Sequence, residues 1–100
     1  MVNKVVWTQK AVNQMENVLN FLSDEVSEKA ATKFLETVLN KVKTLENNTY
    51  EGRPIPNKKT IRFVIIEKHH RLYYRRHGLT LYVAQIYDTR QHPDKKPYSK

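Results

Sequence analysis

The sequence predicts an α+β fold in which a hairpin of two helices packs on one face of an antiparallel sheet, in the order β-α-α-β-β-β. Two amphipathic helical segments follow one another with almost no connection, which favours an antiparallel helical hairpin. Three strand-like runs separated by short turns come later in the chain. A sheet is needed because two helices alone would leave their apolar stripes in water.

The first strand and the first helix occupy the start of the chain. Residues 2–7 are short, β-branched and aromatic, which suits a strand. Thr8 then offers a side-chain oxygen as a helix cap. Apolar residues recur at intervals of three and four, at Ala11, Met15, Val18, Leu19, Leu22 and Val26. This spacing predicts an amphipathic helix that ends near residues 24–25.

A second helix is predicted directly after the first. Ser27 is its capping candidate. Its apolar stripe consists of Ala31, Phe34, Leu35, Val38, Val42 and Leu45. Because so few residues join the helices, both stripes should face one common surface.

An interrupted segment separates the helices from the sheet. Residues 46–59 contain Gly52 and two of the four prolines, which predicts an exposed loop. The three expected strands are residues 60–67, 70–76 and 79–87. Turns at residues 69–70 and 77–78 would join them into a meander.

Composition limits the organisation of the chain. One hundred residues at 39% hydrophobic content suit one compact domain, which we place at residues 1–93, with a polar, proline-broken tail at residues 94–100. The chain has no cysteine, which excludes disulfides and thiolate sites. It also has no apolar run of membrane-spanning length. We therefore expect a cytoplasmic protein that does not associate with membranes.

Charge is distributed unevenly between the two halves of the chain. Residues 1–50 hold six lysines and six acidic residues, 6 − 6 = 0. Residues 51–100 hold twelve Lys and Arg against four acidic residues, 12 − 4 = +8. Such an imbalance indicates a surface that meets a polyanion or an acidic protein. A basic surface with no role beyond solvation is the alternative.

The middle strand of the sheet carries the principal candidate residues. Strand alternation puts Arg71, Tyr73 and Arg75 on one face, whereas Leu72 and Tyr74 face the core. If the two helices cover the core face, the arginine face stays open. The other candidates are Arg62 if register permits, Arg90 at the rim, and Lys58, Lys59 and His92.

This composition is typical of RNA binding, since guanidinium groups bind phosphates and flat rings stack on bases. Arg–Tyr pairs are also ordinary on exposed sheets, so a purely structural role is the alternative. The four histidines lack the spacing of a metal site on a helix, and two glycines are too few for a phosphate-binding loop. We therefore expect no metal and no cofactor. Since Glu67 and Asp88 are isolated, catalysis would be RNA cleavage by the 2′-hydroxyl with arginines stabilising charge.

Several short segments together resemble the RelE/ParE superfamily of toxins over residues 3–93. The segments are Trp7-Thr8-x-x-Ala11, Ala30-Ala31-x-x-Phe34, Leu45 before Gly52-Arg53-Pro54, His70-Arg-Leu-Tyr-Tyr, and Ile86-Tyr-Asp-Thr-Arg90. Their order and spacing are more specific than any one of them.

The resemblance implies the toxin of a type II toxin–antitoxin pair, with a cognate acidic antitoxin as its partner. It implies that Arg71 lies near a scissile phosphate, that Arg90 is the basic residue after the last strand, and that Arg62 is a weaker match. RelE-like members cut mRNA on the ribosome, and ParE-like members poison DNA gyrase. From the sequence we predict a metal-independent mRNA endoribonuclease. The alternatives are a gyrase poison and a non-catalytic nucleic-acid-binding module.

Overall fold

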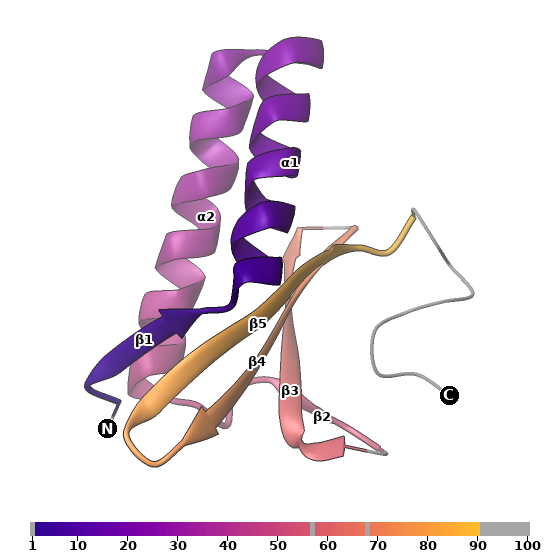
Figure 1. Cartoon of the computed structure of the whole chain (residues 1–100). Helices are drawn as coiled ribbons and strands as arrows, with labels where there is room; N and C mark the ends of the chain where they lie inside the picture. The colour runs from indigo at the N-terminus through magenta and orange to yellow at the C-terminus, as the bar shows by residue number, and fades with distance from the viewer. Residues whose placement is uncertain (1, 57, 68, 91–100) are drawn as a thin grey trace.

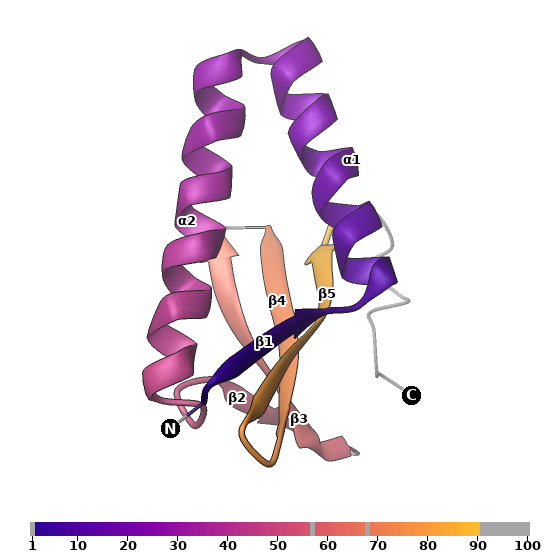
Figure 2. The same cartoon turned by 60° about the vertical axis from the view of Figure 1, so that its left-hand side comes forward.

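The computed structural model describes residues 2–56, 58–67 and 69–90. The elements are β1 (Lys4–Trp7), α1 (Gln9–Glu25), α2 (Glu28–Asn47), β2 (Arg53–Ile55), β3 (Lys58–Glu67), β4 (His70–His77) and β5 (Thr80–Asp88). Both helices lie on the same side of the sheet and extend beyond its end (Figures 1 and 2). The predicted α+β class and helical hairpin are confirmed.

Two hydroxyl side chains begin the helices, as the sequence predicted. The Thr8 hydroxyl accepts a hydrogen bond from the backbone N–H of Ala11 at 3.1 Å. The Ser27 hydroxyl accepts one from the N–H of Ala30 at 3.0 Å. Both caps satisfy an N–H group that would otherwise lack an intrahelical partner. The junction between the helices is therefore fixed within residues 26–27.

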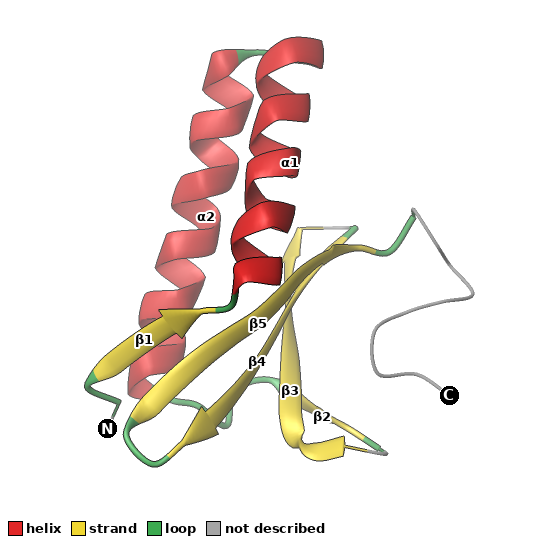
Figure 3. Ribbon diagram, viewed as in Figure 1, coloured by secondary structure: helices red, strands yellow, loops and turns green. Residues whose placement is uncertain are grey.

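The sheet has the strand order β1-β5-β4-β3-β2 and is mixed rather than antiparallel (Figure 3). The pairs β2–β3, β3–β4 and β4–β5 are antiparallel, but β1 runs parallel to β5, with Val5 opposite Leu81. The expectation of an antiparallel sheet was wrong for β1. The direction of β1 relative to β5 depends on how the helical hairpin returns the chain to the sheet. The alternation of side chains within a strand does not reveal this direction.

A short strand lies inside the segment predicted to be a loop. β2 pairs with the edge of β3, with Arg53 opposite Phe63, and β3 itself begins at Lys58. Pro54 is tolerated because β2 is an edge strand, where a missing N–H need not break a ladder. The predicted loop is therefore shorter than residues 46–59.

Apolar side chains fill both faces of the sheet. The main core lies between helices and sheet and includes Phe34, Val38, Leu45, Leu72 and Leu81. A second cluster contains Ile55, Ile61, Tyr73 and Tyr87, with Phe63 and Ala84 packed against it. The sheet face that was expected to stay open is therefore partly covered by its own side chains and by β2.

In the part of the chain that is described, the helices lack the combination of length and apolar character that crossing a membrane requires.

Candidate functional site

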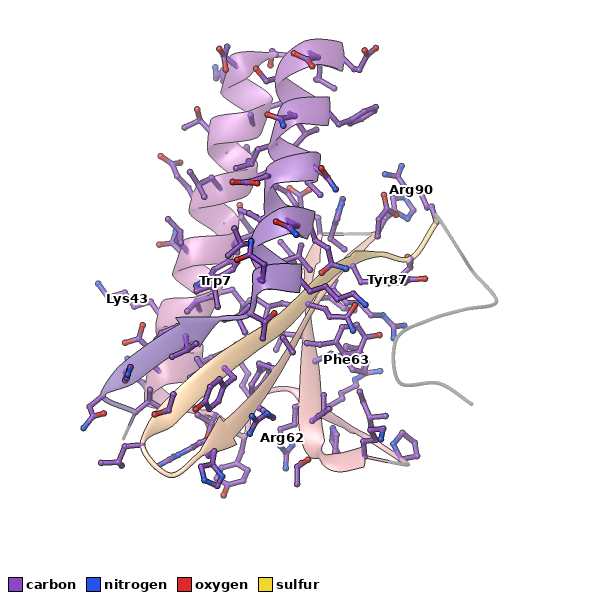
Figure 4. The ribbon with its side chains drawn as sticks, in the orientation of Figure 1. Trp7, Lys43, Arg62, Phe63, Tyr87 and Arg90 are labelled. Atoms are coloured by element: carbon purple, nitrogen blue, oxygen red, sulfur yellow. The ribbon has the colours of Figure 1, made fainter. Side chains whose placement is uncertain are left out.

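The sheet face that carries Arg71, Tyr73 and Arg75, here called the outer face, points away from the helices. Cross-strand register places Arg71 opposite Tyr87, and Arg75 opposite Tyr82. Directly opposed residues share a face, so arginines and aromatic rings meet there. Figure 4 shows Phe63 and Tyr87 on the side of the sheet that faces away from the helices.

Both outer-face arginines lie against aromatic rings. The Arg71 Cζ atom is 4.4 Å from the centroid of Phe63, and the Arg75 Cζ atom is 4.3 Å from the centroid of Tyr82. These are cation–π distances, and each ring limits the positions its guanidinium can take. Phe63 and Tyr82 were not among the sequence candidates. These two rings lie on the strands on either side of the arginines, so they could have been identified only if the register between the strands had been known.

Tyr73 is buried, with 1% of its surface exposed. Its ring centroid lies 5.7 Å from that of Phe63, and its hydroxyl accepts a long hydrogen bond of 3.5 Å from Arg71 Nη1. The expectation that Tyr73 stacks on RNA bases was wrong, because Ile55 of β2 and Ile61 of β3 pack in the same cluster. Tyr73 instead helps to position Arg71.

Arg62 lies on the opposite face from Arg71. Register places it across from Tyr74, on the core side of the sheet. Its Nη1 donates to the carbonyl of Gly52 at 2.8 Å, and its Cζ lies 5.0 Å from the ring centroid of Tyr50. The register therefore does not permit Arg62 to join Arg71. In Figure 4, Arg62 and Arg90 lie at opposite ends of the sheet.

Arg90 is held by Asp88 just beyond the end of β5. Its Nη2 is 3.0 Å from Asp88 Oδ2, and its backbone N–H donates to Asp88 Oδ1 at 2.8 Å, which forms an Asx-turn. Burial alone raises the pKa of Asp88, but the hydrogen bonds from Arg90 and the charges of His70 and Arg90 outweigh it, so the pKa is lowered. Asp88 also raises the pKa of Arg90 through a hydrogen bond and its charge.

Asp88 also contacts His70. His70 Nε2 is 3.8 Å from Asp88 Oδ2, and the imidazole packs edge-on against Phe34 with centroids 4.9 Å apart. Burial lowers the pKa of His70, and the opposing charge of Asp88 does not compensate. His70 begins β4, so the predicted turn includes His69 but not His70.

Of the remaining candidates, the structure describes the side chain of Lys58 alone. Lys58 is exposed at the first position of β3. His92 and the side chain of Lys59 lie outside the described residues, as does the expected tail at residues 94–100. Within residues 2–56, 58–67 and 69–90, no group of three or more His, Asp or Glu side chains is arranged to hold a metal ion. Arg71, Tyr73 and Arg75 are therefore the predicted residues that the fold brings together.

A comparison with protein families identifies the chain. The model described as "ParE toxin of type II toxin-antitoxin system, parDE" matches residues 5–93. The chain belongs to this family. As a ParE-family protein it is a toxin of a type II toxin–antitoxin system.

Solved structures share the fold of this ParE-family chain at low sequence identity. The chromosomal ParDE system from P. aeruginosa has a TM-score of 0.71 and 18% identity, covering 85% of this chain and 94% of that chain. A YoeB/ParE toxin from Agrobacterium tumefaciens has a TM-score of 0.67 and 19% identity, covering 86% and 98%. The E. coli DinJ-YafQ toxin–antitoxin complex has a TM-score of 0.64 and 12% identity, covering 90% and 96%. A comparison with curated protein sequences finds no significant match.

Proposed function

We propose that this ParE-family toxin arrests growth by binding DNA gyrase and does not itself cleave mRNA. The observation that carries the proposal is the separation of the candidate arginines. Arg62 lies on the face opposite Arg71 and is hydrogen-bonded to the Gly52 carbonyl. Cleavage by a 2′-hydroxyl requires charged groups that converge on one phosphorus atom. This pair of arginines does not converge.

The outer face suits a protein target better than a scissile phosphate. Arg71 and Arg75 each lie on an aromatic ring, and Ile65, which is opposite Arg71, is 55% exposed. Arginine with aromatic and aliphatic side chains is the composition of protein-binding hot spots. The match to the ParE model supports the same target, since ParE-like members of the superfamily poison gyrase.

A cognate antitoxin is the second partner that we propose. The structures that share this fold include a ParDE system and a DinJ-YafQ toxin–antitoxin complex. The excess charge of the second half of this chain, 12 − 4 = +8, complements an acidic segment. We propose that such a segment covers Arg71 and Arg75, so that antitoxin and target compete for the outer face.

The proposal is tested by measuring the two activities separately. Purified toxin is added to a gyrase supercoiling assay, and the toxin is also expressed in bacteria while RNA ends are mapped in ribosome-bound messages. We expect inhibition of supercoiling and no new RNA ends. Arg71→Ala with Arg75→Ala should abolish inhibition, whereas Lys43→Ala, a change on the exposed side of α2, should not.

New RNA ends that depend on Arg71 would instead establish the endoribonuclease predicted from the sequence. Growth arrest with unaltered supercoiling and unaltered RNA would exclude both targets. Co-expression of the antitoxin should restore growth in either case, which separates the toxin–antitoxin relationship from the identity of the target.

A further inference from the structure

A hollow of about 450 Å³ lies on the core side of the sheet, beneath the loop that follows α2. Its lining combines the arginines Arg62, Arg75 and Arg76 with the hydroxyl-bearing residues Thr49, Tyr50 and Thr60. The volume lies within the range of about 300–1,000 Å³ that is usual for small-molecule sites. Most of these residues lie on the core side of the sheet, but the hollow shares Arg75 with the outer face, and Arg90 is not among its lining residues.

The loop above the hollow is fixed in place. The buried Tyr74 hydroxyl donates to the carbonyl of Thr49 at 2.8 Å and accepts from the N–H of Gly52 at 2.9 Å. A Cβ atom on Gly52 would lie 2.6 Å from the carbonyl oxygen of Phe63 and from the Tyr74 hydroxyl, so only glycine fits. The hollow therefore has a preorganised wall.

Two guanidinium groups in the lining retain donors for a ligand. Arg62 uses Nη1 for the Gly52 carbonyl. Arg76 uses Nε for the Gly78 carbonyl at 2.7 Å and Nη1 for the Thr49 hydroxyl at 3.5 Å. Each guanidinium has five N–H donors, so several on each remain available in the described structure. These hydrogen bonds orient the two guanidinium groups but leave N–H donors on each of them for a ligand.

The carboxylate nearest along the loop pairs with a lysine of α2, although its charge also acts on Tyr74 in the lining. Glu51 follows Tyr50, but its Oε2 lies 3.3 Å from Lys41 Nζ of α2. Among the described residues, those that line the hollow include no Asp or Glu. The site is therefore electropositive and attracts anions.

We propose that this hollow binds a nucleoside diphosphate, with the phosphates on Arg62 and Arg76 and the base on Tyr50. Tyr50 is 73% exposed and rests on Arg62 through a 5.0 Å cation–π contact, which leaves a surface for stacking. The two guanidinium groups and the hydroxyls of Thr49 and Thr60 supply more hydrogen-bond donors than the two oxygens of a carboxylate can accept. A phosphate group has more acceptor oxygens, so this lining favours phosphate over carboxylate. The proposal does not depend on the gyrase target.

Calorimetric titration of the purified full-length toxin with ADP and with inorganic pyrophosphate tests the site. We expect both to bind, with ADP tighter than pyrophosphate. Arg76→Gln should weaken both ligands by about tenfold, since a charge-assisted hydrogen bond is lost. Lys43→Gln removes the same charge from exposed α2 and should change affinity by less than about twofold. Tyr50→Leu should remove the advantage of ADP over pyrophosphate.

Several outcomes would overturn the proposal. Equal weakening by Arg76→Gln and Lys43→Gln would mean unspecific attraction to a basic protein. If ADP binds no tighter than pyrophosphate, the nucleoside does not contribute to binding. If a short single-stranded DNA binds tighter than ADP, the ligand of the hollow is a phosphodiester chain and not a nucleoside diphosphate. If Arg76→Gln unfolds the protein, Arg62→Lys, which keeps the charge but not the planar fork, serves as the second variant and should also weaken ADP. Gyrase inhibition is measured separately and can fail while this site binds its ligand.

Discussion

Tyr74 satisfies two buried backbone groups with one hydroxyl. The Gly52 N–H and the Thr49 carbonyl both bond to it, at 2.9 and 2.8 Å. Burial raises the pKa of Tyr74, although the Gly52 hydrogen bond and the charge of Arg62 oppose the shift. The hydroxyl therefore stays protonated at neutral pH and can donate and accept at the same time. The position of the loop after α2 depends on it.

Tyr74→Phe should lower the free energy of unfolding by about 2–3 kcal/mol, because two buried backbone groups lose their partner. Urea denaturation monitored by circular dichroism measures the loss. Tyr82→Phe is the matched control: its ring lies under Arg75 and its side chain is only partly buried, so about 0.5 kcal/mol or less is expected. Equal losses in both variants would contradict the role of the Tyr74 hydroxyl.

His70 should make stability depend on pH below about 6.5. Burial lowers its pKa in the folded state, so the unfolded chain binds the proton more readily. The free energy of unfolding should therefore decrease as the pH falls from about 6.5 toward the folded pKa. Chemical denaturation between pH 7.5 and 5 measures this slope.

His70→Phe keeps a ring against Phe34 and should flatten the pH dependence. His77→Gln, a change at an exposed position, should leave it unaltered. Asp88, whose pKa is lowered, affects stability in a different pH range. Its contribution to the free energy of unfolding is present above about pH 4 and is lost as the pH falls through the pKa of the folded state. A slope that survives His70→Phe would assign the effect to another group.

The candidate site was only partly predictable from single residues. Alternation within β4 correctly put Arg71, Tyr73 and Arg75 on one face, because that pattern is a property of the strand itself. It did not reveal the face of Arg62 on β3, which depends on the register between the strands. Nor did it reveal the burial of Tyr73, which depends on β2 folding back beside β3.

At the scale of elements, Thr8 joins α1 to the sheet. Its hydroxyl caps the helix and also donates to the carbonyl of Ala84 in β5 at 2.8 Å, and its N–H donates to Val83. Gln14 of α1 accepts a hydrogen bond from the Ile86 N–H at 2.8 Å. β1 ends opposite Val83. The residues of β5 that follow Val83 therefore find hydrogen-bond partners in Thr8 and in Gln14 of α1.

Thr8→Ala should cost about 2 kcal/mol of unfolding free energy, because it removes both a cap and a hydrogen bond to β5. Ser27→Ala removes a cap alone and should cost about 1 kcal/mol. Thermal denaturation of the two variants compares the losses. A cost for Thr8→Ala no larger than that for Ser27→Ala would mean that the bond to Ala84 contributes nothing.

The elements that local patterns define were predicted well. Both helix caps and the strands of the β3–β5 meander follow from nearby residues, through capping and alternation. β2 was missed because three residues with a proline have no strand pattern of their own. The parallel pairing of β1 was missed because its partner lies more than 70 residues away in sequence.

The whole molecule has a neutral first half and a strongly basic second half. α1 and α2 belong to the first half, and β2 to β5 belong to the second. An acidic partner is therefore attracted to the sheet rather than to the helices. Long-range attraction of this kind acts mainly on the rate of association.

The association rate of the antitoxin should fall by about tenfold or more when the salt concentration rises from about 50 to about 500 mM. Stopped-flow fluorescence with Trp7 as the reporter measures this rate. Arg75→Gln should reduce the rate at low salt more than Lys43→Gln does, because Arg75 lies on the sheet and Lys43 on α2. A rate that does not depend on salt would exclude the basic half as the steering surface.

The parallel pairing of β1 with β5 also affects when the protein can become active during synthesis. Residues 4–7 must wait for residues 80–83 before they gain their strand partner. Until then the apolar surface of the helical hairpin has no finished sheet to cover, and contacts of such long sequence separation form slowly. A nascent chain therefore cannot complete its fold until nearly all of the domain has left the ribosome. That delay gives an antitoxin already present in the cell time to meet the toxin as it folds.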